Sequence, residues 1–199
     1  MSDSASRRMV ARAAAKLAAA RGFALPALIL MTDDDRLPDP LAAAAALPRG
    51  SMVIVRARAP SRLRALALAL RHVAAERGLF LSVAGDVALA RSIGADGVHL
   101  PEARIGEAAA IRACSRLFIT ASAHSLAALR GADAVDALIL SPVFATASHP
   151  GGASLGPMRA NTMAGLCPLP VYALGGITAA NAARLAGFCG IAAIGALRG

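Results

Sequence analysis

Two stretches near the end of the chain decide the fold. Residues 170–177 read Pro-Val-Tyr-Ala-Leu-Gly-Gly-Ile, and residues 190–196 read Gly-Ile-Ala-Ala-Ile-Gly-Ala. Each is an apolar strand that ends in glycine, which is typical of the seventh and eighth strands of a phosphate-binding (β/α) barrel. Backbone N–H groups beyond two such strands can converge on a phosphate dianion. The residues predicted to do so are Gly175, Gly176, Gly195 and Ala196. Taken alone, the two stretches fit equally well with buried strands followed by ordinary turn glycines.

The rest of the chain alternates strand-like and helical patterns, which favours an α/β fold with a parallel sheet. The strand-like runs are mostly apolar, as expected for strands covered on both faces. The predicted strands are 28–32, 52–56, 79–83, 97–100, 117–121, 137–143, 171–174 and 191–194. The predicted helices between them are 39–47, 61–77, 86–93, 105–113, 125–130, 157–166 and 178–186. Eight strands favour closure into a (β/α)8 TIM barrel.

The length of 199 residues suits a single domain spanning residues 1–199, and no internal linker is visible. The residues after the eighth strand are too few for another helix, so we expect the last helix to be truncated. An extra helix is predicted over residues 4–20. We expect it to compensate in part by lying across the N-terminal end of the barrel.

Composition argues against several classes of protein. The net charge is +9, but the arginines are scattered and there is no tryptophan, so we expect no nucleic-acid partner. No apolar stretch approaches the ~20 residues of a membrane span, and residues 4–20 lack the apolar core of a secretory signal. The three cysteines lack metal-ligand spacing, which fits reduced thiols in a cytoplasmic protein.

Several polar residues follow the predicted strands, where a barrel of this kind carries its functional groups. Arg56 and Arg58 lie two residues apart and share a face if the strand continues, where they can hold an anionic group or remain solvated. Ser122 can hydrogen-bond a ligand or start the next turn. Thr146, after the sixth strand, is a candidate substrate-binding residue. His149 lies in a loop rich in glycine, proline and serine (147–156) that resembles a mobile lid, where it can contact a phosphate or face solvent.

Two histidines lie at or near strand ends. His124 is the candidate for catalysis, because an imidazole that titrates near neutrality can both remove and return a proton. The alternative for His124 is a structural role, as a cap of the following helix or a partner for a core carbonyl. His99 lies within the fourth strand, and we expect it to be structural, with its side chain pointing into the barrel.

Five segments resemble the family of thiamine phosphate synthase and the related TenI-type thiazole tautomerase. They read Leu-Met-Thr-Asp (30–33), Gly-Ala-Asp-Gly-Val-His-Leu-Pro (94–101), Ser-Ala-His-Ser (122–125), Pro-Val-Phe-Ala-Thr (142–146) and Ala-Leu-Gly-Gly-Ile (173–177). They occur in family order and cover most of the chain. The resemblance implies a barrel that acts on a thiazole phosphate in thiamine biosynthesis, and it suggests a homodimer.

The chain departs from the synthase pattern where the family holds magnesium. An Asn-Asp pair after the third strand is replaced by Ala84-Gly85, and residues 101–104, where the family has a further aspartate, read Pro-Glu-Ala-Arg. The resemblance implies that the family aspartates hold an ion that neutralises a leaving pyrophosphate, and neither glycine nor arginine supplies the oxygen ligands it needs. Glu102 or Asp86 can substitute only with a shifted backbone.

Positive charge on the second strand is kept, because the family's Arg-x-Lys pair reads Arg56-Ala57-Arg58, while its lysine after the sixth strand falls at His149. The first prediction is therefore a TenI-like tautomerase without metal, in which His124 moves a proton during aromatisation of a thiazole carboxylate phosphate. One alternative is a thiamine phosphate synthase that joins a thiazole phosphate to a pyrimidine pyrophosphate with Mg2+. The other is a catalytically silent protein that binds a phosphate ligand of the same pathway.

Overall fold

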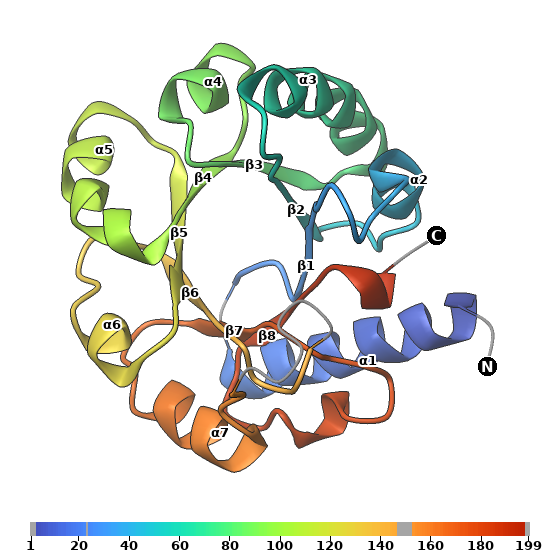
Figure 1. The fold of residues 1–199 in the computed structure, drawn as a ribbon, viewed down its shortest axis with the longest axis vertical. Coiled ribbons are helices and arrows are strands. Elements are labelled where there is room, and N and C mark those ends of the chain that lie inside the picture. The colour runs from blue at the N-terminus through green and yellow to red at the C-terminus, as the bar shows by residue number, and fades with distance from the viewer. Residues whose placement is uncertain (1–2, 23, 147–152, 198–199) are drawn as a thin grey trace.

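Eight parallel strands close into a barrel, in chain order from β1 to β8, in the computed structural model (Figure 1). The structure describes residues 3–22, 24–146 and 153–197. The strands are β1 (Leu28–Met31), β2 (Met52–Val55), β3 (Phe80–Ala84), β4 (Gly97–Leu100), β5 (Phe118–Ala123), β6 (Ala137–Leu140), β7 (Val171–Ala173) and β8 (Gly190–Ala193). The predicted TIM barrel is therefore confirmed. Pairing of β1 with β8, from Leu28 opposite Ile191 to Leu30 opposite Ala193, closes the sheet.

Helices surround this barrel on its outer face (Figure 1). They are α1 (Asp3–Arg21), α2 (Pro40–Ala45), α3 (Pro60–Arg77), α4 (Val87–Ser92), α5 (Ala108–Cys114), α6 (Leu126–Arg130) and α7 (Pro157–Gly165). Three short 3-10 helices complete the set: η1 (Glu102–Glu107), η2 (Ala182–Arg184) and η3 (Gly195–Leu197). Among the described residues, no helix combines the length and the apolar character needed to cross a bilayer.

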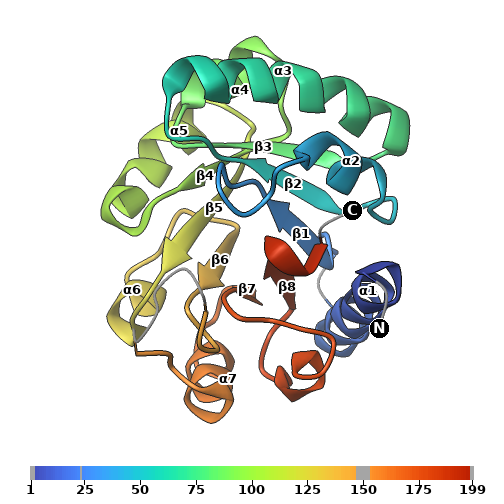
Figure 2. The ribbon, with the colours of Figure 1, turned by 45° about the vertical axis from the view of Figure 1, so that its right-hand side comes forward.

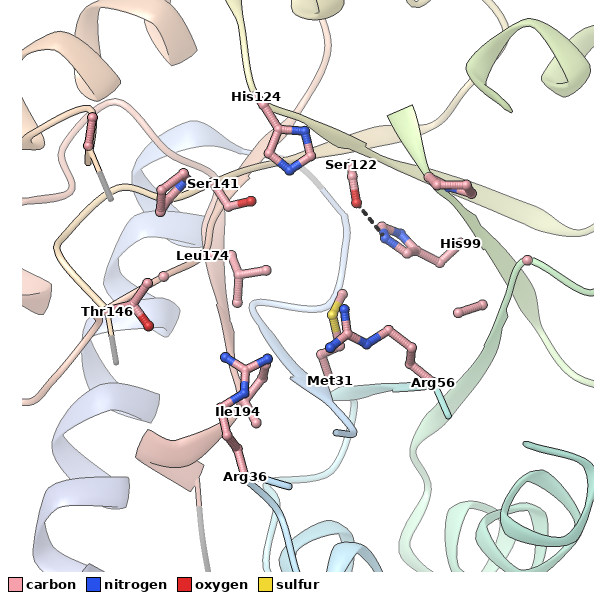
Figure 3. A pocket seen from close by; sticks show the side chains of 16 residues that line it. Met31, Arg36, Arg56, His99, Ser122, His124, Ser141, Thr146, Leu174 and Ile194 are labelled. Carbon is pink, nitrogen blue, oxygen red and sulfur yellow. Dashed lines mark hydrogen bonds between the residues drawn. The ribbon is translucent and has the colours of Figure 1, made fainter. Parts of the chain in front are cut away.

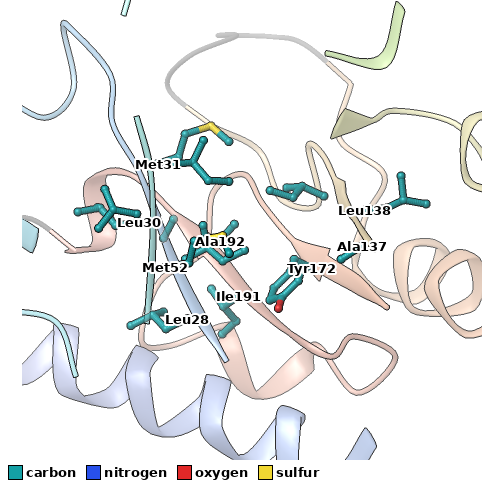
Figure 4. Packing of buried hydrophobic residues seen from close by; sticks show 14 of the residues in the cluster. Leu28, Leu30, Met31, Met52, Ala137, Leu138, Tyr172, Ile191 and Ala192 are labelled. Carbon is teal, nitrogen blue, oxygen red and sulfur yellow. The ribbon is translucent and has the colours of Figure 1, made fainter. Parts of the chain in front are cut away.

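Apolar side chains fill the barrel and the layer beneath the helices. Every residue of β1, β2, β4, β6 and β8 is buried, as their nearly continuous apolar sequences predict. Figure 4 shows Met52 of β2, Tyr172 of β7 and Ile191 of β8 among the side chains of this core. The Tyr172 hydroxyl donates a hydrogen bond to the Pro26 carbonyl at 2.7 Å, which ties β7 to the segment before β1. Its ring is fully buried, and burial raises the pKa of the phenol.

The extra helix α1 lies along the side of the barrel. It contacts β1 and β8 and both of the last 3-10 helices, η2 and η3, and Val10 and Ala14 on its inner face are fully buried. Figure 2 shows it beside the C-terminal segment of the chain. It therefore occupies the place in the outer ring that a helix after β8 would take. The expectation that it would lie across the N-terminal end of the barrel is corrected.

Two predicted elements are shorter than expected. β6 ends at Leu140, because the following Pro142 has no N–H group to continue the parallel ladder. The predicted helix 178–186 is mostly turn, with η2 as its only helical part. There the Asn181 side chain accepts from the Thr178 backbone N–H (2.8 Å) and donates to the Gly176 carbonyl (2.9 Å). These side-chain bonds to the backbone compete with the helical pattern.

Candidate active site

A cavity of about 630 Å3 lies at the carboxyl ends of the strands (Figure 3). A smaller cavity of about 320 Å3 adjoins it, and the two share Arg36, Thr146, Leu174, Gly175 and Ile194 in their walls. Together they form a mouth with two compartments. This is the end of a TIM barrel that carries active sites.

The smaller cavity contains all four residues predicted to bind phosphate. Gly175 and Gly176 follow β7, Gly195 and Ala196 follow β8, and Thr146 completes this wall from the loop after β6. The structure thus brings together backbone segments that lie some twenty residues apart in the sequence. Backbone N–H groups of such loops can form an anion site.

The glycines after β7 are required by packing as well as by any ligand. Gly176 has φ +63°, and a Cβ there would collide with the Ala145 carbonyl oxygen. Gly175 has φ +100°, and its Cβ would lie 2.9 Å from the Cα of Pro142. The loop after β6 therefore presses against the loop after β7, and only glycine fits. The sequence predicted the glycines for close approach to phosphate but did not predict this contact.

Two arginines of the larger cavity share one carboxylate. Asp33, just after β1, accepts from the Arg36 guanidinium at 2.7 Å and from the Arg36 backbone N–H at 3.0 Å. The Arg56 guanidinium also donates to the same carboxylate. These hydrogen bonds, those from Arg36 above all, hold the pKa of Asp33 well below its usual range. With two cations on one anion, this wall of the cavity keeps an excess of positive charge.

The structure does not place Arg58 with Arg56 at the cavity. Arg58 lines neither compartment; its guanidinium pairs with Asp35, and its side chain is 76% exposed. Its backbone N–H donates to Asp34 at 2.9 Å. Strand β2 ends at Val55, so the alternation that would put both arginines on one face does not reach them.

His124 lines the larger cavity just beyond β5. Its ring Nδ1 lies 2.7 Å from Oε2 of Glu102, and its backbone N–H donates to the same oxygen at 2.6 Å. A carboxylate only accepts hydrogen bonds, so a neutral His124 ring carries its proton on Nδ1. Nε2 is then the atom able to take a proton from a ligand.

His99 and Ser122 lie deeper on the same side of the larger cavity (Figure 3). Nε2 of His99 is 3.0 Å from Oγ of Ser122, and Nδ1 is 2.9 Å from Oγ1 of Thr120. Burial first, and the positive charge of Arg56 second, lower the pKa of His99 to about 4. His99 does point into the barrel, as predicted, and it also reaches the cavity wall.

The carboxylates near the mouth do not fit a hard divalent cation. Asp33 is bound by two arginines, Asp86 caps α4 by accepting from the Leu89 N–H at 2.8 Å, and Glu102 accepts from His124. Beside Gly85, where the resemblance implies a metal ligand, Arg104 donates to the Gly85 carbonyl at 2.7 Å, which puts a cation there. Within residues 3–22, 24–146 and 153–197, no three His, Cys, Asp or Glu side chains converge as a metal site requires.

Sequence reasoning missed Arg36 and the positioning role of Glu102. The Asp33–Arg36 contact has a local signal, since an aspartate side chain that accepts from the backbone N–H two residues later, as Asp33 does from Asp35, is a common turn. The contact between Glu102 and His124 joins two loops and has no local signal. His149 lies outside the described residues.

Comparisons with known proteins agree on one family. A family model described as thiamine monophosphate synthase matches residues 28–197. A thiamine-phosphate synthase of Methanoculleus marisnigri is 38% identical over 150 residues, 71% of this chain and 71% of that protein. A putative thiamine-phosphate synthase 2 of Aquifex aeolicus is 40% identical over 95 residues, 47% of this chain and half of that protein.

One solved structure agrees with this family, and a second shares the fold. A thiamine phosphate pyrophosphorylase from Pyrococcus furiosus superposes with a TM-score of 0.69 at 25% identity, over 84% of both chains. FabK from Thermotoga maritima superposes with a TM-score of 0.62 at 18% identity, over 92% of this chain and 64% of that chain, which shows the fold alone. Since the family model spans the whole barrel and the synthase of Methanoculleus aligns with most of the chain, the chain belongs to the thiamine monophosphate synthase family, whose place is in thiamine biosynthesis.

Proposed function

We propose that this chain is a thiamine-phosphate synthase, which joins a thiazole phosphate to a pyrimidine pyrophosphate. The observation that carries the proposal is the mouth with two compartments, where a glycine-lined cavity adjoins a wall that contains Arg36 and Arg56. Such a mouth can hold two anionic substrates at once. The relatives named as synthases favour this reaction over the tautomerase that the sequence first predicted.

In this proposal the thiazole phosphate places its phosphate in the smaller cavity. Backbone N–H groups at Gly175, Gly176, Gly195 and Ala196 would bind it there, with Thr146 beside them. The thiazole ring then extends into the larger cavity, whose wall includes the apolar side chains Met31 and Leu174. Aromatic rings bind well in apolar pockets that carry a few polar groups.

The pyrimidine pyrophosphate would place its two phosphates against Arg56 and Arg36. A bond forms between the thiazole and the pyrimidine methylene carbon, the bond from that carbon to oxygen breaks, and pyrophosphate leaves with the electron pair. Negative charge develops on the leaving group, and the arginine pair would stabilise it. Because the carboxylates at the mouth do not fit magnesium, we assign this charge stabilisation to the arginines.

A specific contact favours a second candidate, the TenI-type tautomerase. The bond from His124 Nδ1 to Glu102 orients the imidazole and leaves Nε2 as a base at the cavity wall. A base held in this way suits removal of a proton from a thiazole carboxylate phosphate and its return at another carbon. The synthase step described above transfers no proton between carbon atoms and so does not use such a base. A homodimer and a cytoplasmic location stay predictions.

The experiment that tests the proposal mixes the purified chain with thiazole phosphate and pyrimidine pyrophosphate, in Mg2+ and in EDTA, and measures thiamine phosphate. We expect product in both conditions, with about a hundredfold loss in Arg56→Ala, because a transition-state charge contact is removed. Arg62→Ala is the matched control, since Arg62 pairs with Asp34 away from both cavities.

Other outcomes separate the alternatives. Product only with Mg2+ would keep the synthase and overturn the assignment of charge stabilisation to the arginines. Absence of product, with turnover of the thiazole carboxylate phosphate tautomer, would replace the synthase with the tautomerase. Binding of thiazole phosphate without either turnover would identify a silent binding protein.

A further inference from the structure

His99 is held between two hydroxyl groups of the neighbouring strand. Its imidazole, on β4, lies 2.9 Å from Thr120 Oγ1 through Nδ1 and 3.0 Å from Ser122 Oγ through Nε2. Thr120 and Ser122 alternate along β5 and so face the same side. His99 is 4% exposed and Thr120 is fully buried, whereas Ser122 lines the larger cavity (Figure 3).

The imidazole is neutral at physiological pH and therefore carries one proton. Burial lowers the pKa of His99 to about 4, so the charged form is absent near pH 7. A neutral imidazole has one N–H donor and one bare nitrogen that accepts. Two tautomers are possible, and they give the Ser122 hydroxyl opposite roles.

Thr120 decides between the tautomers. Its hydroxyl has His99 as its one hydrogen-bond partner in the part of the chain that the structure describes. If Nδ1 carried the proton, Nδ1–H would donate to Thr120, and the threonine's own buried O–H would lack an acceptor. If Nε2 carries the proton, the Thr120 O–H donates to Nδ1, and Nε2–H donates to Ser122. Only the second arrangement gives an acceptor to both the His99 N–H and the buried Thr120 O–H.

We infer that Thr120 fixes His99 as the Nε2–H tautomer, and that Ser122, which accepts from Nε2–H, directs its own O–H hydrogen into the cavity. Ser122 therefore offers its O–H to a hydrogen-bond acceptor on the ligand. The identity of the ligand rests on the proposed function: the acceptor is a ring nitrogen or an anionic oxygen of the thiazole phosphate or of the pyrimidine pyrophosphate. His99 and Thr120 are positioning residues behind Ser122.

The tautomer can be measured directly in the full chain. Histidine labelled with 15N gives long-range proton–nitrogen correlations that distinguish a protonated from a bare ring nitrogen, and loss of one set of signals in His99→Gln assigns the residue. At pH 7 we expect the His99 signals of a protonated Nε2 and a bare Nδ1. A protonated Nδ1 would overturn the inference, whatever the chain catalyses.

Binding measurements test the role of the serine. By calorimetry with thiazole phosphate and with inorganic pyrophosphate as probes, we expect Ser122→Ala to weaken at least one probe about tenfold. Thr120→Val, which keeps the shape but removes the hydroxyl, should weaken the same probe severalfold and change the His99 tautomer signals. Thr162→Val on the exposed face of α7 is the matched control and should change neither quantity.

The results also separate this inference from the proposed function. Unchanged affinity for both probes in Ser122→Ala would overturn the donor role of the serine. Failure of the unsubstituted chain to bind either probe would overturn the proposed function, while the tautomer is still read from the same labelled sample. His99→Gln keeps an N–H donor toward Ser122, whereas His99→Leu does not. The glutamine variant should therefore bind the probe more tightly than the leucine variant, a difference that a merely structural role would not produce.

Discussion

One oxygen of Glu102 accepts hydrogen bonds from both the backbone N–H and the ring Nδ1 of His124, at 2.6 and 2.7 Å. Glu102 is the first residue of η1 after β4, and His124 directly follows β5. The carboxylate thus joins two loops at the mouth of the barrel and fixes the imidazole against rotation. Glu102, weighed from the sequence as a metal ligand, is in the structure a partner of the histidine.

This contact makes Glu102→Gln a sharp test of the tautomerase candidate. In an assay of thiazole carboxylate phosphate, we expect His124→Ala to abolish turnover and to leave affinity for the product within about twofold, because the base is lost and the phosphate loops remain. Glu102→Gln should lower kcat about tenfold with little change in KM, since the imidazole loses its anionic partner. Kinetics over a range of pH measure both effects.

Glu107→Gln serves as the control for Glu102→Gln. Glu107 also lies in η1, but its carboxylate pairs with Arg104 at 2.7 Å and lines neither cavity. It should retain the kinetics of the unsubstituted chain. An equal loss in both variants would mean that the position of η1, and not the bond to His124, controls the rate.

Arg36 is expected to control the affinity for thiazole phosphate, because it lies in the wall of both cavities. Replacing it with glutamine removes one cation near the glycine loops, and we expect the Kd to rise about tenfold, as for loss of a charge-assisted hydrogen bond. Calorimetric titration measures the Kd. Arg62→Gln, whose guanidinium pairs with Asp34, should bind as the unsubstituted chain does. Equal affinities in the two variants would remove Arg36 from the site.

The fold could be predicted because its signals are local. Most strands of the barrel are short apolar runs that end near glycine or polar residues. A strand covered on both faces has this pattern in its own sequence, so it can be recognised without knowing which strands it pairs with. The glycines after β7 and β8 lie where the sequence placed them, around the smaller cavity. The side-chain contacts at the mouth join separate loops, so they have no such local signal in the sequence.

Arg58 shows why the site was harder to predict than the fold. The alternation of side chains along a strand predicts the face on which a residue lies only while the strand continues, and β2 ends at Val55, before Arg58. Beyond that point the direction of a side chain depends on partners from another loop, and Asp35 draws Arg58 away from the cavity. The contact of Glu102 with His124 likewise depends on how far η1 lies from the end of β5, which no single segment encodes.

Gly176→Ala should disrupt the phosphate compartment. The substitution adds a methyl group that collides with the Ala145 carbonyl, at a residue with φ +63°. We expect thiazole phosphate binding to be lost and the free energy of unfolding to fall by more than ~1 kcal/mol, the cost of left-handed backbone alone. Gly94→Ala is the matched control, since its φ is +64° and nothing lies within 4 Å of the added Cβ. Gly94→Ala should lose only that ~1 kcal/mol of the free energy of unfolding and keep its affinity for thiazole phosphate. Denaturation in urea and calorimetry separate the two effects.

The buried His99 predicts how stability depends on pH. Its pKa is about 4 in the folded chain against 6.5 for an ordinary histidine, because burial and then Arg56 disfavour the imidazolium. Between these values the unfolded chain binds the proton and the folded chain does not, so acid favours unfolding. The contribution of His99 to the free energy of unfolding is complete above pH 6.5 and is lost as the pH falls through 4, by ~3 kcal/mol in all.

His99→Gln should remove this part of the pH dependence, because glutamine does not titrate. We expect urea denaturation of the unsubstituted chain to show a free energy of unfolding that falls between pH 7 and pH 4 by ~3 kcal/mol more than that of His99→Gln. His72→Gln on α3 is the control, since that residue is exposed and replacing it should leave the difference in place. Carboxylates titrate in both chains and cancel in the comparison. If the free energy of unfolding depended on pH in the same way in the unsubstituted chain and in His99→Gln, His99 would be hydrated in the folded chain. It would then not be held between the Thr120 and Ser122 hydroxyls.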